Sequence, residues 1–198
     1  MSRLEVTVAQ TREIILDAAL RVIQEQGLAR ATTKEIAKAA GFSEAALYKH
    51  FTDKSEIFLG VLHERSPRFP DMQRALTTKP GTATVEANLA ELASAAIAFY
   101  HHNFPMFASI FSDPVILDTH RTRLRQLGMG PHLANQALAR YLAAEQQLGR
   151  VRADADVEAA ADLFLGGCFQ AAFLAHFTGR DRPDAPERYA ALLRSLLA

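Results

Sequence analysis

Residues 33–51, TKEIAKAAGFSEAALYKHF, constrain the fold of this chain more than any other stretch. They predict two short helices joined by a tight turn. Thr33 offers a side-chain oxygen that can cap the start of the first helix, and Glu35 places an acid in its first turn. Gly41 is suited to end this helix, because glycine adopts the left-handed backbone conformation at little cost.

The second predicted helix begins at Ser43, and Leu47 and Phe51 share its inner face because they are four residues apart. Two helices joined by a short turn that contains glycine are typical of the helix-turn-helix, whose second helix enters the major groove of DNA. The alternative is an ordinary corner in an all-helical core. Hydrogen-bond donors for phosphate on the rest of this helix favour the DNA-binding interpretation. These donors are Tyr48, Lys49 and His50.

Residues 32–58, TTKEIAKAAGFSEAALYKHFTDKSEIF, resemble the DNA-binding signature of the TetR family of tetracycline-repressor-like regulators. The resemblance is dense here, whereas the rest of the chain resembles the family only in length and helical architecture. The matching residues are Thr33, Ile36, Ala37, Ala40, Gly41, Ser43, Leu47, Tyr48, Phe51 and Lys54.

The resemblance assigns DNA-reading roles by position. Lys34 occupies a family position that can reach a guanine edge, where a lysine donates to O6 and N7. Alanines on the groove-facing surface contact only thymine methyl groups, and Glu44 accepts only from cytosine N4 or turns away. Thr33 and Ser43 are expected to bind phosphate. The predicted DNA contacts are Thr33, Lys34, Ser43, Glu44, Ala45, Ala46, Tyr48, Lys49, His50 and Lys54.

The charge balance gives nucleic-acid binding no support of its own. The 198 residues carry 22 Lys and Arg against 22 Asp and Glu, so there is no overall basic footprint. Between Gly27 and Lys54, five basic residues face three acidic ones. A dimeric protein can bind DNA with few phosphate contacts per subunit, so we give the motif more weight than the net charge.

Composition predicts a soluble, cytoplasmic protein. The single cysteine, Cys168, excludes an internal disulfide and suits a reducing compartment. The N-terminus lacks the apolar core of a signal peptide. Residues 155–178 are nearly apolar enough for a membrane span, but Asp162, Gln170 and His176 interrupt them, so we expect no membrane association.

Helical periodicity predicts an all-α fold of about nine helices, with a loose arm before Val8 and no strand of real length. A first helix is expected at about residues 11–27, followed by the two short helices within residues 33–51. Further helices are expected at about 53–65, 84–101, 104–112, 115–127, 131–148, 155–178 and from 185 onward. Three prolines and a glycine between residues 66 and 82 mark a boundary. We therefore predict a helix-turn-helix domain with its connecting helix over residues 1–65, and an effector-binding and dimerisation domain over residues 66–198.

Two C-terminal segments predict a homodimer. Residues 155–178 are apolar almost all round, which predicts burial against both the chain's own core and a partner subunit. The last helix carries a row of leucines that needs a cover. We expect a two-fold symmetric four-helix bundle. Its predicted interface residues are Phe164, Gly167, Phe173, Tyr189, Leu192, Leu193 and Leu196.

No catalytic motif is recognisable: the chain lacks HExxH, a glycine-rich phosphate loop and GxSxG. We therefore expect no enzyme activity, no metal and no cofactor. Cys168 is expected to serve packing, with redox sensing as the minor alternative. Histidines raise a metal hypothesis, but none has a ligand-type partner four residues away, so structural roles are expected. They include His101, His102, His120, His132 and His176.

Aromatic residues of the C-terminal half fit a simple core, but in the resembled family the equivalent helices enclose an effector cavity. Small residues among the rings leave space for a mostly apolar ligand. The predicted ligand residues are Asn88, Phe99, His102, Phe107, Phe111, Tyr141, Asp162, Phe169 and Gln170.

The resemblance implies a dimeric repressor that binds a palindromic double-stranded DNA operator and is released by a small effector. Ligand is expected to shift the helix that begins at Lys54 and so to change the separation of the two recognition helices, which DNA tolerates only at set spacings. An activator and a ligand-independent regulator remain open. A helical small-molecule enzyme or carrier is the further alternative, and the missing acid–base residues count against it.

Overall fold

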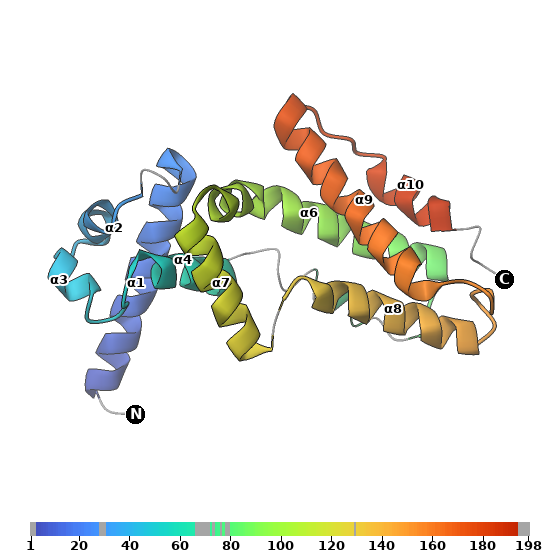
Figure 1. Cartoon of the computed structure of the whole chain (residues 1–198), viewed down its shortest axis with the longest axis horizontal. Helices are drawn as coiled ribbons and strands as arrows, with labels where there is room; N and C mark the ends of the chain where they lie inside the picture. The colour runs from blue at the N-terminus through green and yellow to red at the C-terminus, as the bar shows by residue number, and fades with distance from the viewer. Residues whose placement is uncertain are drawn as a thin grey trace. The chain divides into compact units, whose positions relative to one another are not determined.

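The computed structural model describes residues 3–27, 31–65, 72, 74, 75, 77, 80–128 and 130–193. Its regular elements in these ranges are helices (Figure 1), which confirms the all-α prediction. They are α1 (Arg3–Gln26), α2 (Thr33–Ala40), α3 (Glu44–Leu47), α4 (Lys54–Glu64), α6 (Val85–Ser112), α7 (Pro114–Leu127), α8 (His132–Gln147), α9 (Val157–Thr178) and α10 (Ala185–Leu192). The first helix begins at residue 3, so the loose arm was wrong; residues 3–10 contain no glycine or proline that would stop a helix.

Caps define the helix-turn-helix. Thr32, rather than Thr33, caps α2: its hydroxyl accepts a hydrogen bond from the Glu35 N–H at 3.2 Å, and the Glu35 carboxylate accepts from the Thr32 N–H at 3.1 Å. Gly41 ends α2 in the left-handed conformation, with φ of 77°. The Ser43 hydroxyl accepts from a backbone N–H of α3 at 3.2 Å. The predicted turn is confirmed, with its first cap one residue earlier.

The chain forms two compact units, residues 1–66 with 105–127 and residues 67–104 with 128–198. The first unit therefore contains more than the predicted domain 1–65. Its core includes Met106 and Ile110 of α6 and Ile116 of α7, packed with residues of α1, α2 and α4. Apolar side chains of this kind fit either core equally well by sequence, and the predicted domain boundary at residues 65 and 66 stays a prediction.

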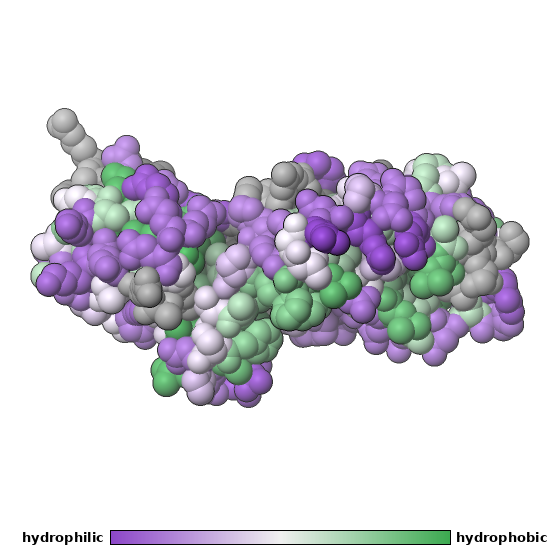
Figure 2. Space-filling view, turned by 90° about the horizontal axis from the view of Figure 1, so that it is seen from above, coloured by the Kyte–Doolittle hydropathy of each residue, from purple (hydrophilic) through white to green (hydrophobic). Residues whose placement is uncertain are grey.

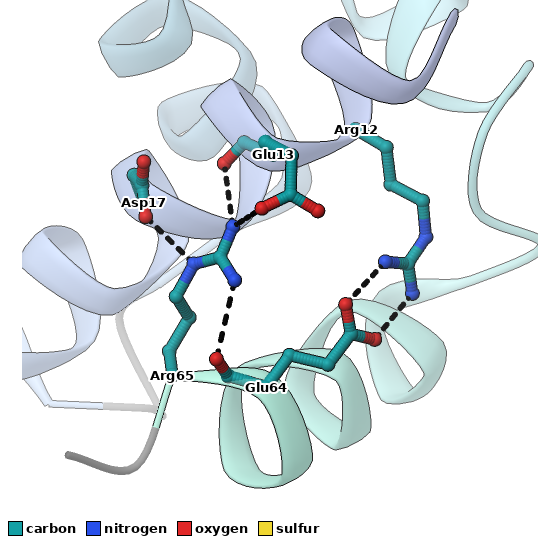
Figure 3. A network of polar contacts seen from close by, with 5 residues as sticks. All are labelled: Arg12, Glu13, Asp17, Glu64 and Arg65. Carbon is teal, nitrogen blue, oxygen red and sulfur yellow. Dashed lines mark hydrogen bonds and ion pairs between the residues drawn. The ribbon is translucent and has the colours of Figure 1, made fainter. Parts of the chain in front are cut away.

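Arg12 ties α1 to the end of α4 in the first unit (Figure 3). Its guanidinium donates two hydrogen bonds to the Glu64 carboxylate, at 2.5 and 2.7 Å. The same guanidinium lies 5.3 Å from the centroid of the Phe51 ring, within range of a cation–π contact. One side chain thus contacts both the connecting helix and the residue that anchors the segment after α3.

Arg65, directly after α4, makes a second link to α1 (Figure 3). Its Nε donates to the Asp17 carboxylate at 2.7 Å, and its terminal nitrogen donates to the carboxylate of Glu13. Charge-assisted hydrogen bonds of this planar, forked geometry fix orientation as well as distance. They join residues about fifty positions apart, so no local sequence pattern predicted them.

The prediction of separate helices at 84–101 and 104–112 was wrong, because α6 continues through Pro105. Proline has no N–H, so it cannot bond the carbonyl of His101 four residues earlier. His176 of α9 replaces that bond: its Nε2 donates to the His101 carbonyl oxygen at 2.7 Å. The His176 ring also stacks on the rings of His101 and Phe104, with centroids 4.4 and 5.1 Å apart. The helix continues because another helix satisfies the carbonyl that proline leaves open.

The core of the second unit is built from α6, α8, α9 and α10 (Figure 1). Cys168 of α9 is fully buried there, and desolvation raises the pKa of its thiol to about 12. A thiol with so high a pKa holds almost no thiolate near neutral pH, which fits a packing role.

Within the chain α9 is buried on one face, in the core of the second unit, as expected for the part that packs against the chain's own core; its burial against a partner subunit stays a prediction. Its opposite face leaves Leu163 74% and Phe177 79% exposed. By length and composition α9 is the one helix in the described ranges that could cross a membrane, a test that a core helix of a soluble protein also passes.

We expect His176→Ala to lower the free energy of unfolding by about 1 kcal/mol, because it removes the donor to the His101 carbonyl. In a Pro105→Ala background a backbone N–H can supply that bond, so His176→Ala should have less than half this effect. Urea unfolding of the four proteins of the double-mutant cycle measures the coupling. Equal effects in both backgrounds would contradict the assignment.

Glu56 generates a pH-dependent contribution to stability. Its carboxylate accepts hydrogen bonds from the hydroxyl and N–H of Thr52, both at 2.6 Å, which lower its pKa from the ordinary value of 4.5. A carboxyl with a lowered pKa stabilises the fold above its unfolded-state pKa, and this contribution is lost as pH falls below about 4.5. Glu56→Gln should therefore flatten the fall in melting temperature between neutral and acid pH, whereas Glu25→Gln, at an exposed position of α1, should leave the slope as it is.

Candidate nucleic-acid interface

Most predicted DNA contacts lie on an exposed corner formed by α2, α3 and the turn that follows (Figure 1). α3 itself is a single turn, and residues 48–50 continue it as a tight turn with hydrogen bonds from Lys49 N–H to Ala46 O at 3.2 Å and from His50 N–H to Leu47 O at 3.0 Å. The expected helix as far as residue 51 is therefore shorter. Exposed members of the predicted set are Lys34, Ser43, Glu44, Ala45, Tyr48 and Lys49, and half-buried members are Thr33, Ala46, His50 and Lys54.

Buried side chains behind the corner hold it in place. Leu47 and Phe51 are 0% and 1% exposed in the core of the first unit, where Ile15, Ile36 and Phe58 are also buried. Because a one-turn helix has little stability of its own, this burial decides where the exposed residues of α3 point. The predicted inward direction of Leu47 and Phe51 is confirmed.

Three predicted DNA contacts bond one another across the corner. The Thr33 hydroxyl donates to Oε1 of Glu44 at 2.5 Å, and the Tyr48 hydroxyl donates to the Thr33 oxygen at 3.4 Å. Of the two orientations considered for Glu44, the carboxylate thus adopts the one turned toward α2. In this conformation Thr33 and Tyr48 direct their protons into the protein.

The cations of the corner remain available for phosphate. Lys34 lies in the first turn of α2, Lys38 in its last turn, and Lys49 in the turn after α3, and all three are exposed. Among the described residues none of the three forms an ion pair. Basic side chains that no carboxylate neutralises are the groups that phosphate oxygens attract.

The predicted ligand residues Asn88 and Tyr141 lie together in a buried polar network. The Asn88 side-chain amide donates to the Tyr141 hydroxyl at 2.8 Å, and burial raises the pKa of Tyr141 to about 12. Glu145, 0% exposed, accepts from the Gly81 N–H at 3.1 Å and pairs with Arg150 Nε at 3.1 Å. Sequence reasoning missed Glu145, although an acid one turn after Tyr141 on the apolar face of α8 was a readable signal.

Aromatic rings of the second unit gather between α6 and α9. Tyr100 and Phe169 have centroids 5.4 Å apart, and Phe99 contacts Tyr100 at 5.5 Å. Phe104 lies 6.0 Å from Phe169 and 5.7 Å from Phe173. The predicted ligand residues Phe99 and Phe169 therefore belong to one aromatic cluster, defined here as these five rings.

Other predicted ligand residues lie elsewhere. Phe107 and Phe111 belong to the first unit, where Phe111 is 70% exposed. In the second unit His102 is half-buried and Gln170 is exposed. Residues 107 and 111 lie on the same helix as residue 99, because α6 continues to Ser112. The separate helix 104–112, which was expected to bring residues 107 and 111 to the same cavity as residue 99, is not formed.

Asp162 lines an open groove of about 790 Å³ between α8 and α9. Its carboxylate accepts from the Asn135 side-chain amide at 2.5 Å. His132 and Arg140 also line the groove. Apolar side chains share its walls with these polar groups, among them Pro131, Ala139, Ala143 and Val157.

In the part of the chain that the structure describes, histidines make packing and pairing contacts. His101 and His176 stack on each other, and His101 Nε2 lies 3.7 Å from the carboxylate of Asp181. No group of three His, Cys, Asp or Glu side chains in the described part of the chain is arranged to hold a metal.

Several predicted interface residues serve the chain's own packing. Phe164 and Leu193 are buried in the second unit, which corrects their assignment to a subunit interface. Gly167 lets α10 approach α9, since a Cβ there would lie 3.3 Å from the Tyr189 ring. Phe173 and Leu192 are exposed, and Leu196 lies outside the described residues.

Two family models match the chain. The model described as bacterial regulatory proteins, tetR family, matches residues 15–61. The model described as AefR-like transcriptional repressor, C-terminal domain, matches residues 107–197. Both describe regulators of transcription rather than enzymes.

Known proteins agree with these matches. The HTH-type transcriptional regulator AcrR of Shigella flexneri is 51% identical over 49 residues, 25% of this chain and 23% of that protein, so the chain spans about a quarter of this curated relative. A TetR-family regulator from Mesorhizobium loti has a TM-score of 0.76 at 22% identity and covers 100% of both chains. The complex of SmeT with triclosan has a TM-score of 0.65 at 24% identity, over 92% of this chain and 91% of that one. SmeT is a repressor of a multidrug efflux pump of Stenotrophomonas maltophilia.

The structural matches are below 25% identity and establish the fold. The two family models match both ends of the chain, and the first of them spans the helix-turn-helix described above. The chain is a member of the TetR family of bacterial transcriptional regulators.

Proposed function

We propose that this chain is a cytoplasmic transcriptional repressor that binds a palindromic operator as a homodimer and is released by a small, mostly apolar effector. The observation that carries the proposal is the exposed α2–α3 corner, with unneutralised lysines on a buried hydrophobic support. The match to a repressor C-terminal domain over residues 107–197 supports the direction of regulation.

Lysines supply the main DNA contacts in this proposal. Lys34 donates to a guanine edge, and Lys49 donates to backbone phosphate together with His50 and Lys54. The exposure of Lys34 and Lys49 supports these roles. Ala45 and Ala46 limit base recognition by α3 to contacts with thymine methyl groups.

A second copy covers the outer face of α9 in the proposed dimer. Leu174 follows Leu163 by eleven residues, about three helical turns, and Phe177 follows Leu174 by three, so these side chains share one face of α9. All three are exposed, as is Phe173 beside them. Leu192 of α10 is 71% exposed. Seen from above, the half of the molecule that contains α9 and α10 carries green, apolar areas on its surface (Figure 2). A soluble subunit rarely leaves such a row of side chains uncovered.

Effector binding belongs to the second unit in this proposal. The aromatic cluster offers the apolar, aromatic surface that small hydrophobic ligands prefer, and the similar fold of SmeT accommodates triclosan. α6 is one helix whose residues belong to both units, and it offers a path from the effector to the first unit. Within the first unit, Arg12 and Arg65 join α4 to α1. Release requires the effector to bind more tightly to the dimer conformation whose recognition helices do not match the half-site spacing of the operator. Because coupling is reciprocal, bound DNA lowers the affinity for effector by the same factor by which effector lowers the affinity for DNA.

We predict that Lys49→Ala weakens binding to all duplexes alike and lowers the salt slope by about one per subunit, because a phosphate contact carries no sequence information. Lys34→Ala should instead lower the preference for one base pair by about 1–3 kcal/mol. Fluorescence anisotropy with the DNA upstream of the chain's own gene, across a salt series, measures both. Arg182→Ala, which removes one positive charge at an exposed position of the second unit, is the matched control.

We predict that Leu163→Glu gives a monomer at micromolar concentration and abolishes operator binding, because it places a charge in the proposed apolar interface. Val115→Glu makes the same change at a position of α7 with 71% exposure and should leave the dimer intact. Light scattering after size-exclusion chromatography measures both masses. A Leu163→Glu dimer, or a wild-type monomer, would contradict the proposed interface.

A further inference from the structure

Glu44 accepts a hydrogen bond from Thr33, a residue that is predicted to bind DNA phosphate. Thr33 donates its hydroxyl proton to Glu44 Oε1 at 2.5 Å, and Tyr48 directs its own toward the Thr33 oxygen at 3.4 Å. A hydroxyl has one proton to donate, so neither group can bond a phosphate while this chain of hydrogen bonds persists. In this structure, the Glu44 carboxylate accepts the hydroxyl proton that Thr33 would donate to a phosphate.

Carboxylate and phosphate are alternatives at the same donor. Both are anions that accept short, charge-assisted hydrogen bonds, and the donors that position DNA phosphates include threonine and tyrosine hydroxyls. The Thr33–Glu44 bond is intramolecular and needs no association, so it competes at high effective concentration. The Glu44 carboxylate is exposed, so its charge also repels an approaching phosphate.

Neighbouring acids do not share this role. Glu35 accepts hydrogen bonds from the N–H and hydroxyl of Thr32 as part of the α2 cap, at 3.1 Å each. Its carboxylate is therefore committed to helix capping. Lys34, next to Thr33, forms no ion pair within the described ranges. Glu44, by contrast, accepts a hydrogen bond from Thr33, a residue predicted to bind phosphate.

We propose that Glu44 is an autoinhibitory competitor for phosphate at Thr33, which sets an affinity threshold for every duplex without reading its sequence. The inference rests on the proposed DNA-binding function. DNA binds only when the Thr33 hydroxyl releases the Glu44 carboxylate and donates its hydrogen bond to a phosphate oxygen instead. The Tyr48 hydroxyl then turns from the Thr33 oxygen toward the phosphate as well. Since phosphate contacts carry no base information, the threshold acts equally on operator and random DNA.

The test uses the full chain with two duplexes of equal length, the DNA upstream of its own gene and a random sequence. Glu44→Gln removes the charge and keeps an acceptor, so affinity for both duplexes should rise about three- to tenfold. Glu44→Ala removes the acceptor as well and should bind at least as tightly. Glu91→Gln changes the net charge equally at an exposed position of α6 and is the matched control, with no expected change.

A double-mutant cycle with Thr33→Val separates the specific contact from a general charge effect. Without the hydroxyl the carboxylate is no longer held in the corner, so Glu44→Gln should gain less than half as much in the Thr33→Val background. Circular dichroism melting shows whether each variant is folded.

Four results would overturn the inference: no gain with Glu44→Gln, a gain as large with Glu91→Gln, an equal gain without Thr33, or a loss confined to duplexes with cytosine at one position. The last would mean that Glu44 reads cytosine N4. If the wild-type chain binds neither duplex in dilute salt, the proposed function itself fails. Wild-type binding without the Glu44 effect contradicts this inference alone.

Discussion

The geometry of the DNA-facing corner depends on the burial of Leu47 and Phe51. α3 is one turn long, and an isolated turn is not stable in water. Both side chains are almost fully buried in the first unit, and Arg12 closes over the Phe51 ring from α1. The exposed residues of α3 and of the turn after it therefore take their direction from two apolar contacts, while the caps at Thr32, Gly41 and Ser43 set where α2 and α3 begin and where α2 ends.

Residues with local signals were predictable. The α2–α3 turn, the start of α4 near Asp53 and the end of α9 at Gly179 followed from capping chemistry that operates within four residues. The family assignment followed from the same short stretch. Predicted contact residues such as Lys34 and Lys49 lie on the exposed corner, but their binding roles remain predictions.

The errors occurred where a distant residue decides the outcome. Pro105 predicts a helix end, but in the structure α6 continues through it and His176 of α9 donates a hydrogen bond to the His101 carbonyl. Phe164 was predicted to lie in the subunit interface, but residues of α6, α8 and α10 bury it within the chain. In both cases the deciding contact comes from a helix far along the sequence, which periodicity does not identify.

The proposal that a dimer places two α2–α3 corners on DNA can be tested by hydroxyl-radical footprinting of the DNA upstream of the chain's own gene. This method reports which nucleotides the two corners protect. We expect two protected patches on one face of the DNA, related by two-fold symmetry and separated by about one helical turn or a multiple of it. A single unsymmetrical patch would contradict the dimeric arrangement. An unprotected ladder at saturating protein in low salt would contradict DNA recognition altogether.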